Sequence, residues 1–136
     1  MNTKTILIFE DEWNTIKGSF ELANIYAFED QLRFKVKAKS QDVSFDDLRN
    51  EYSAIFVDIT LAKNTQLDGF NIIKKISDEN RFDLNKVVVL TGNNKVEEKL
   101  NEMQLNTDDI TIVYKPVDFE ELSDVLRKVL SLISNK

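Results

Sequence analysis

Short apolar runs alternate along the chain with segments of helical period. Apolar runs at 6–9, 54–57, 87–90 and 110–114 predict β-strands. The runs at 54–57 and 87–90 contain no polar residue, which is typical of central parallel strands covered on both faces. Between the runs, apolar residues recur at intervals of three and four residues and predict amphipathic helices. The apolar positions of these helices are Trp13, Ile16, Phe20, Ala23 and Ala27; Ile72, Ile73 and Ile76; Val96, Leu100 and Met103; and Phe119, Leu122, Leu126, Val129 and Ile133.

One further strand is predicted at 32–38, with one apolar face and one wholly basic face. Along it, Leu32, Phe34, Val36 and Ala38 alternate with Arg33, Lys35, Lys37 and Lys39. The basic face is either a docking stripe for an acidic partner or the guarded side of an edge strand. Lysines on an edge strand oppose edge-to-edge pairing with other chains, and the pattern favours this second interpretation.

The order of the elements predicts an α/β fold. A short helix is expected at 44–51, and Asp118 followed by Glu121 is a capping pattern for the start of the last helix. Strands and helices alternate five times within 136 residues that contain no linker, repeat or low-complexity stretch. This alternation predicts a single domain over residues 1–136, with a doubly wound parallel sheet and right-handed crossovers. Functional sites of such sheets lie outside the carboxyl ends of the strands.

Composition removes several classes of chemistry. The chain has no Cys and no His, which excludes disulfides, thiol nucleophiles, thiolate or imidazole zinc sites, Ser-His-Asp catalysis and a phosphohistidine carrier. Its net charge of −6 argues against a general nucleic-acid binder and against a polybasic membrane anchor. No apolar run exceeds four residues, so we expect no membrane span, no signal peptide and a cytoplasmic location.

Polar side chains that suit phosphoryl chemistry stand where the predicted strands end. These are Glu10, Asp11, Asp58, Thr91 and Lys115. Each alone is commonly a turn residue or a helix cap, but together they place three carboxylates, a hydroxyl and an ammonium at one rim. Crowded carboxylates repel unless a cation joins them, and oxygen ligands suit Mg²⁺. Asp58 is placed as a nucleophile toward phosphorus, with Lys115 as its ion-pair partner and Thr91 as a donor to a phosphoryl oxygen.

Five motifs carry a resemblance to a known family. They are ILIFEDE at 6–12, AIFVDI at 54–59, LDGF at 67–70, VVVLTG at 87–92 and YKP at 114–116. With the motifs in this order and at this spacing, the chain resembles a response-regulator receiver domain of two-component signalling over essentially its whole length. The resemblance implies a flavodoxin-like fold with five parallel strands in the order 2-1-3-4-5 and helices on both faces.

The resemblance also implies roles for the acidic residues. Asp58 would be the phosphoacceptor. It would also be a ligand of Mg²⁺, together with the carboxylate of Asp11 and the backbone carbonyl of Thr60. Glu10 stands where Asp is more frequent in the family, and its longer arm would still reach the metal through water.

Phosphorylation would then be the signal. Thr91 and Lys115 would hold the phosphoryl group, which adds about −1.5 to −2 charge, and would draw in the loop after strand 87–90. This movement would reshape the surface of the fourth helix, strand 110–114 and the last helix, which a downstream protein would read. A sensor histidine kinase or a phosphotransfer protein would supply the phosphoryl group. The protein would catalyse only its own phosphorylation and dephosphorylation, and without an output domain it would act through a partner.

Two further features depart from the family pattern. Many receivers carry an aromatic residue three positions before the lysine, where this chain has Ile112. The usual threonine–aromatic switch is therefore not expected, and Ile112 is interpreted as a packed strand residue. Residues 62–66 lengthen the loop after Asp58 by about three residues, at little cost in stability.

Two other functions stay open at the level of sequence. An aspartyl phosphatase or phosphotransferase uses similar chemistry but needs a second acid two residues after the nucleophile, where this chain has Thr60. A phosphorylation-independent interaction module on a receiver scaffold typically lacks the acidic pair, the phosphoacceptor or the lysine. This chain keeps all of them, which favours a phosphorylatable receiver.

Overall fold

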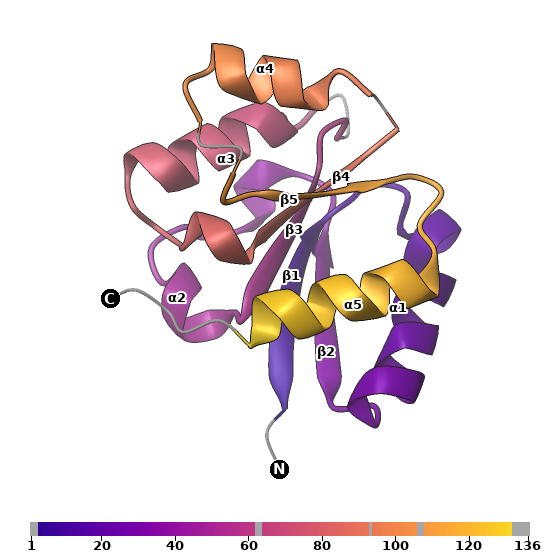
Figure 1. Cartoon of the computed structure of the whole chain (residues 1–136). Helices are drawn as coiled ribbons and strands as arrows, with labels where there is room; N and C mark the ends of the chain where they lie inside the picture. Colours follow the sequence, from indigo (N-terminus) through magenta and orange to yellow (C-terminus); the bar gives the residue numbers. More distant parts are fainter. Residues whose placement is uncertain (1–2, 62–63, 93, 106–107, 132–136) are drawn as a thin grey trace.

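Five parallel strands form one sheet in the order β2-β1-β3-β4-β5 (Figure 1). The computed structural model describes residues 3–61, 64–92, 94–105 and 108–131. The strands are β1 (Lys4–Phe9), β2 (Leu32–Lys37), β3 (Ala54–Asp58), β4 (Val87–Thr91) and β5 (Thr111–Tyr114). All five predicted strands are confirmed, with ends that differ by no more than two residues. The α/β fold class and the strand order implied by the resemblance are confirmed as well.

Helices cover both faces of the sheet (Figure 1). On one face lie α1 (Trp13–Phe28) and α5 (Phe119–Leu130); on the other lie α2 (Leu48–Glu51), α3 (Gly69–Asp78) and α4 (Val96–Glu102). Two single turns, η1 (Ser40–Asp42) and η2 (Leu84–Lys86), lie in the connections. Within the described ranges, none of the helices is both long enough and apolar enough to cross a membrane.

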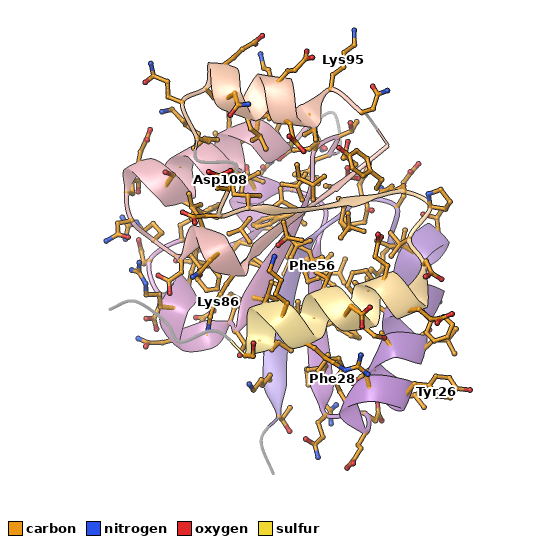
Figure 2. All side chains as sticks on the ribbon, viewed as in Figure 1. Tyr26, Phe28, Phe56, Lys86, Lys95 and Asp108 are labelled. Carbon is orange, nitrogen blue, oxygen red and sulfur yellow. The ribbon has the colours of Figure 1, made fainter. Side chains whose placement is uncertain are left out.

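β3 and β4 lie at the centre of the sheet, as their apolar sequences predict. Every residue of β3 and β4 is buried, because helices cover both sides of them. Phe56 of β3 shows the packing: it is fully buried in the core cluster shared with α1 and α5, and Figure 2 shows it between the sheet and α5. The paired carboxyl ends of β1, β3, β4 and β5 lie in sequence along one rim, which brings the residues after these strands together.

β2 is an edge strand, as predicted. Leu32, Phe34 and Val36 pack with the core cluster under α1 and α5. The register pairs Lys35 with Leu7 and Lys37 with Phe9, so the lysines lie on the opposite face, which α2, α3 and α4 cover elsewhere.

Two helix predictions need adjustment, and one residue of a third lies outside the described residues. The helix expected at 44–51 is wrong in its first half, since only Leu48–Glu51 is helical. The Ser44 hydroxyl accepts from the Asp46 amide at 3.4 Å, a local bond that competes with a helical start. Met103 follows the end of α4 and forms its C-cap, and Ile133 lies outside the described residues. At the start of α5 the predicted cap is present: Asp118 accepts from the Glu121 amide at 3.2 Å.

Candidate functional site

The residues predicted at the strand ends lie together along the carboxyl rim of the sheet. Glu10 directly follows β1, Asp58 and Thr91 end β3 and β4, and Lys115 directly follows β5. Glu10, Asp58 and Thr91 are buried, with exposed fractions of 1%, 5% and 3%, whereas Asp11 is exposed. The rim therefore combines buried polar groups with one exposed carboxylate, an arrangement that stability of the fold does not require.

Lys115 joins two of the carboxylates. Its Nζ lies 2.8 Å from Glu10 Oε1 and 3.1 Å from Asp58 Oδ2. The Lys115 amide also donates to the Thr91 carbonyl at 2.8 Å, which ties the lysine to the end of β4. The ion pair between Lys115 and Asp58 is confirmed. The second ion pair, between Lys115 and Glu10, was not predicted. The sequence signal that could have indicated it is the longer side chain of Glu at a position where Asp was considered more usual.

A backbone amide and the Lys115 side chain fix the orientation of the Asp58 carboxylate. Its Oδ1 accepts from the Thr60 amide at 2.9 Å, while Oδ2 faces Lys115. Beneath it, the first residue of α3 approaches the end of β3 very closely: a Cβ built on Gly69 would stand 2.4 Å from the Asp58 carbonyl oxygen. Sequence reasoning used Gly69 only as part of a motif and did not assign it this packing role.

Three carboxylates form a group that fits a hard cation. Oxygen atoms of Glu10, Asp11 and Asp58 all lie within 4.8 Å of one another. One of the three residues is exposed and two are buried, so the group is open to solvent on one side. Carboxylate oxygens with room for water are the ligand set that suits Mg²⁺ in proteins. The residues present therefore fit the metal that the sequence predicts.

Burial and charge shift two pKa values at the rim. Burial, helped by the hydrogen bond with Asp58, raises the pKa of Glu10 from its ordinary value of 4.5 to about 7, although Lys115 acts in the opposite direction. Burial also works to lower the pKa of Lys115, but the hydrogen bonds and charges of Glu10 and Asp58 outweigh it, so that pKa is raised. Without an added cation, Glu10 thus holds a proton more readily than an ordinary glutamate.

This shift predicts that the metal-free protein loses stability as pH rises. Between pH 4.5 and about 7 the folded chain keeps a proton on Glu10 that the unfolded chain has released. The free energy of unfolding should therefore fall across this window, by about 3 kcal/mol at most. Urea unfolding in the presence of a chelator measures the slope, and Glu10→Gln, which has no such proton, should lose this component. An equal fall in the variant would contradict the assignment.

The loop after Asp58 is held against the loop after β2. Ser40 Oγ accepts from the Leu67 amide at 2.9 Å, and the Ser40 amide donates to Thr65 Oγ1 at 2.9 Å. Gln41 adds two hydrogen bonds. Its Nε2 donates to the Asn64 carbonyl at 2.8 Å, and its Oε1 accepts from the Gln66 amide at 2.9 Å. The longer loop was predicted, but these contacts were not. Ala62 and Lys63, the first two residues of the segment 62–66, lie outside the described residues.

No family model matches the sequence, and no curated protein sequence is significantly similar to it. The receiver domain of the sensor histidine kinase PA1611 from Pseudomonas aeruginosa PAO1, solved with magnesium in its active-site cleft, matches with a TM-score of 0.67 and 23% identity, over 96% of this chain and 100% of that one. The N-terminal signal receiver domain of a two-component response regulator from Bacteroides fragilis matches with a TM-score of 0.64 and 18% identity, over 97% and 100%. The chain has the receiver-domain fold.

The receiver fold leaves the function to be argued from the side chains. Another match is a member of a family of redox sensors in the streptococci that evolved from two-component response regulators. Its TM-score is 0.63 at 19% identity, over 93% of this chain and 51% of that one. Because one fold can serve different functions, the site residues carry the argument. In this receiver fold, the carboxylates of Glu10, Asp11 and Asp58 lie with Thr91 and Lys115 at the carboxyl ends of the strands.

Proposed function

We propose that this chain is a phosphorylatable receiver with Asp58 as its phosphoacceptor. The observation that carries the proposal is the surroundings of Asp58: a buried carboxylate, paired with Lys115 at 3.1 Å, inside a carboxylate group that fits Mg²⁺. Buried ionisable groups coupled to a specific charged partner are characteristic of functional sites. The structural neighbours described as receiver domains agree with this role.

The proposed reaction is phosphoryl transfer to Asp58. A carboxylate oxygen of Asp58 attacks the phosphorus of the donor, the bond to the donor's leaving atom breaks, and an acyl phosphate forms. Oδ1 is held by the Thr60 amide, so Oδ2, which faces Lys115, is the oxygen placed to attack. Lys115 then moves its contact from the carboxylate to a phosphoryl oxygen, and the Thr91 hydroxyl donates to another.

Mg²⁺ would be held by Asp11, Asp58 and the carbonyl of Thr60, with Glu10 acting through water. When bound, the metal supplies positive charge that offsets the repulsion between carboxylates and phosphoryl oxygens. Glu10 accepts a hydrogen bond from Lys115, so this residue links the ammonium to the cation site. No external substrate would be turned over, since the chain would catalyse only its own phosphorylation and dephosphorylation.

Mg²⁺ should change the fluorescence of Trp13. This residue begins α1 two positions after Asp11, and its indole packs on Phe20 at 5.2 Å and Phe34 at 6.0 Å. We expect a saturable change in wild type and at least about tenfold weaker binding in Asp11→Asn. Binding should be unchanged in Asp42→Asn, which removes an exposed carboxylate of η1. Equal affinity in both variants would contradict the metal assignment.

The affinity for Mg²⁺ should also fall below pH 7, because protonation of Glu10 competes with the cation.

The partners follow from the same proposal. A sensor histidine kinase or a phosphotransfer protein would supply the phosphoryl group. A downstream protein would read the face formed by α4, β5 and α5. Ile112 of β5 is partly buried and packs against the core cluster that contains Val96 and Leu100 of α4. The response is therefore expected to pass from Thr91 to α4 without rotation of an aromatic side chain at position 112.

The test of the proposal is chemical. After incubation with acetyl phosphate and Mg²⁺, intact mass should show one phosphoryl adduct on wild type and none on Asp58→Asn, and hydroxylamine should remove the adduct. Thermal unfolding should show that Asp58→Asn is folded, so that the missing adduct reports the loss of the carboxylate. No adduct on wild type, repeated with phosphoramidate, would instead favour a phosphorylation-independent interaction module.

A further inference from the structure

The cations of β2 form a surface that the phosphorylation site does not use. We call Arg33, Lys35 and Lys37 of β2, together with Lys39 two residues after its end, the basic stripe. They occupy alternate positions, about 6.6 Å apart along the strand. Within the described residues, the side chains of Lys35, Lys37 and Lys39 make neither an ion pair nor a hydrogen bond. In a chain with 24 acidic and 18 basic residues, ion pairing does not explain this row of like charges.

The backbone edge beside the stripe is open in the middle of β2. The carbonyl of Lys37 accepts from Glu10 at 2.9 Å, so the odd-numbered residues direct their backbone groups toward β1. Phe34 and Val36 therefore direct theirs outward, where no described residue bonds them. The amino end of the edge is closed, because Asn24 bonds both the amide and the carbonyl of Leu32.

A cavity lies past the carboxyl end of the stripe, on the same face of the sheet. It has a volume of about 310 Å³, and Ser40, the residue after Lys39, is one of its lining residues. Val43, Phe45 and Leu67 give it an apolar wall, and all three belong to or pack against the core cluster on that face. The edge therefore offers cations and free backbone groups, with an apolar recess beyond its carboxyl end.

We infer that β2 binds an extended acidic segment of a partner protein as an added strand. Alternate side chains of an extended peptide have the same spacing as the stripe, so carboxylates of the segment can lie beside Lys35 and Lys37. The backbone of the segment pairs with the free groups of Phe34 and Val36. An apolar side chain farther along enters the cavity next to Ser40.

The observations favour a peptide over a nucleic acid. Strand addition uses backbone amides and carbonyls, which a nucleic acid does not supply in this pattern. A polyphosphate that follows the stripe would also meet the exposed carboxylates of Asp11 and Glu12, which lie just after the bond between Glu10 and the Lys37 carbonyl. This surface is distinct from Asp58, so the interaction does not depend on phosphorylation.

The test uses a short labelled peptide of alternating glutamate and threonine, with a glutamine–threonine peptide as the neutral control. We expect the acidic peptide to bind the wild-type chain in a salt-dependent manner and the neutral peptide to bind at least about tenfold more weakly. Binding should be lost in Lys35→Glu with Lys37→Glu and reduced in the milder Lys35→Gln with Lys37→Gln. Hydrogen exchange at the Phe34 and Val36 amides should slow when the peptide is bound.

The matched control is Lys17→Glu with Lys99→Glu, which makes the same change in net charge at exposed positions of α1 and α4. It should bind the acidic peptide within about twofold of wild type. Equal loss in both double variants, or tighter binding of a single-stranded oligonucleotide than of the peptide, would overturn the proposal. So would the absence of peptide binding to wild type, which would leave the stripe as protection of an edge strand.

Discussion

Replacing Gly69 by alanine is expected to lower the free energy of unfolding by about 2 kcal/mol or more. An added Cβ would stand 2.4 Å from the Asp58 carbonyl oxygen, 2.6 Å from the Ile59 Cα and 3.0 Å from the Asp58 carbonyl carbon. All three atoms belong to the backbone, so no side-chain rotation relieves the contact. Either α3 or the end of β3 must shift, and both carry the geometry of the phosphoacceptor.

Gly18 provides the matched control for this substitution. It lies in the middle of α1, and a Cβ built there meets nothing within 4 Å. Gly18→Ala should raise the free energy of unfolding by about 0.5–1 kcal/mol, because alanine favours the helix. Urea unfolding of both variants measures the difference, and phosphorylation by acetyl phosphate should slow only in Gly69→Ala. A neutral effect of Gly69→Ala on stability would show that the close approach of α3 is not maintained.

Removing the Lys115 side chain is the second change with a large expected effect. Lys115→Ala leaves Glu10 and Asp58, both buried, without their shared cation. Near pH 8 we expect a loss of about 2–3 kcal/mol in the free energy of unfolding. The loss should shrink as pH falls toward 4.5, because Glu10 then carries a proton in the variant as well. Added Mg²⁺ should restore stability and bind about tenfold more tightly than in wild type, since no ammonium competes for the carboxylates.

A surface lysine separates this effect from a general loss of charge. Lys74 pairs with Asp78 at 3.2 Å on the exposed side of α3, so Lys74→Ala should cost less than about 1 kcal/mol and leave Mg²⁺ affinity unchanged. Lys115→Ala should still accept a phosphoryl group, whereas the hydrogen-exchange response of α4 and β5 to phosphorylation should be blunted. A normal exchange response, or Mg²⁺ affinity equal to that of wild type, would count against the role given to Lys115.

Sequence patterns were sufficient for the sheet because its strands differ so clearly in polarity. β3 and β4 are uniformly apolar and lie at the centre, while β2 has one basic face and lies at the edge. Parallel strands place their carboxyl ends on one rim, so the residues after them could be assigned to one site from order alone. The ion pair between Lys115 and Asp58 followed from the same reasoning.

Contacts that depend on side-chain reach and on distant loops could not be predicted this way. Glu10 meets Lys115 because its longer arm bends into the rim, a choice that no periodicity encodes. The hydrogen bond between Ser40 and Leu67 joins residues 27 positions apart in the sequence. The start of the short helix was misplaced because the hydrogen bond from the Asp46 amide to the Ser44 hydroxyl and the stacking of Phe45 on Phe9, with 6.2 Å between ring centroids, override local helix propensity.

The most direct test of the account asks which carboxylate receives the phosphoryl group. The wild-type chain is phosphorylated with acetyl phosphate and Mg²⁺, the acyl phosphate is reduced with borohydride, and the peptides are mapped by mass. We predict reduction at Asp58 alone, converting that residue to homoserine, with Glu10 and Asp11 unchanged. Reduction at Glu10 or Asp11, or at no residue, would contradict the proposal that Asp58 is the phosphoacceptor.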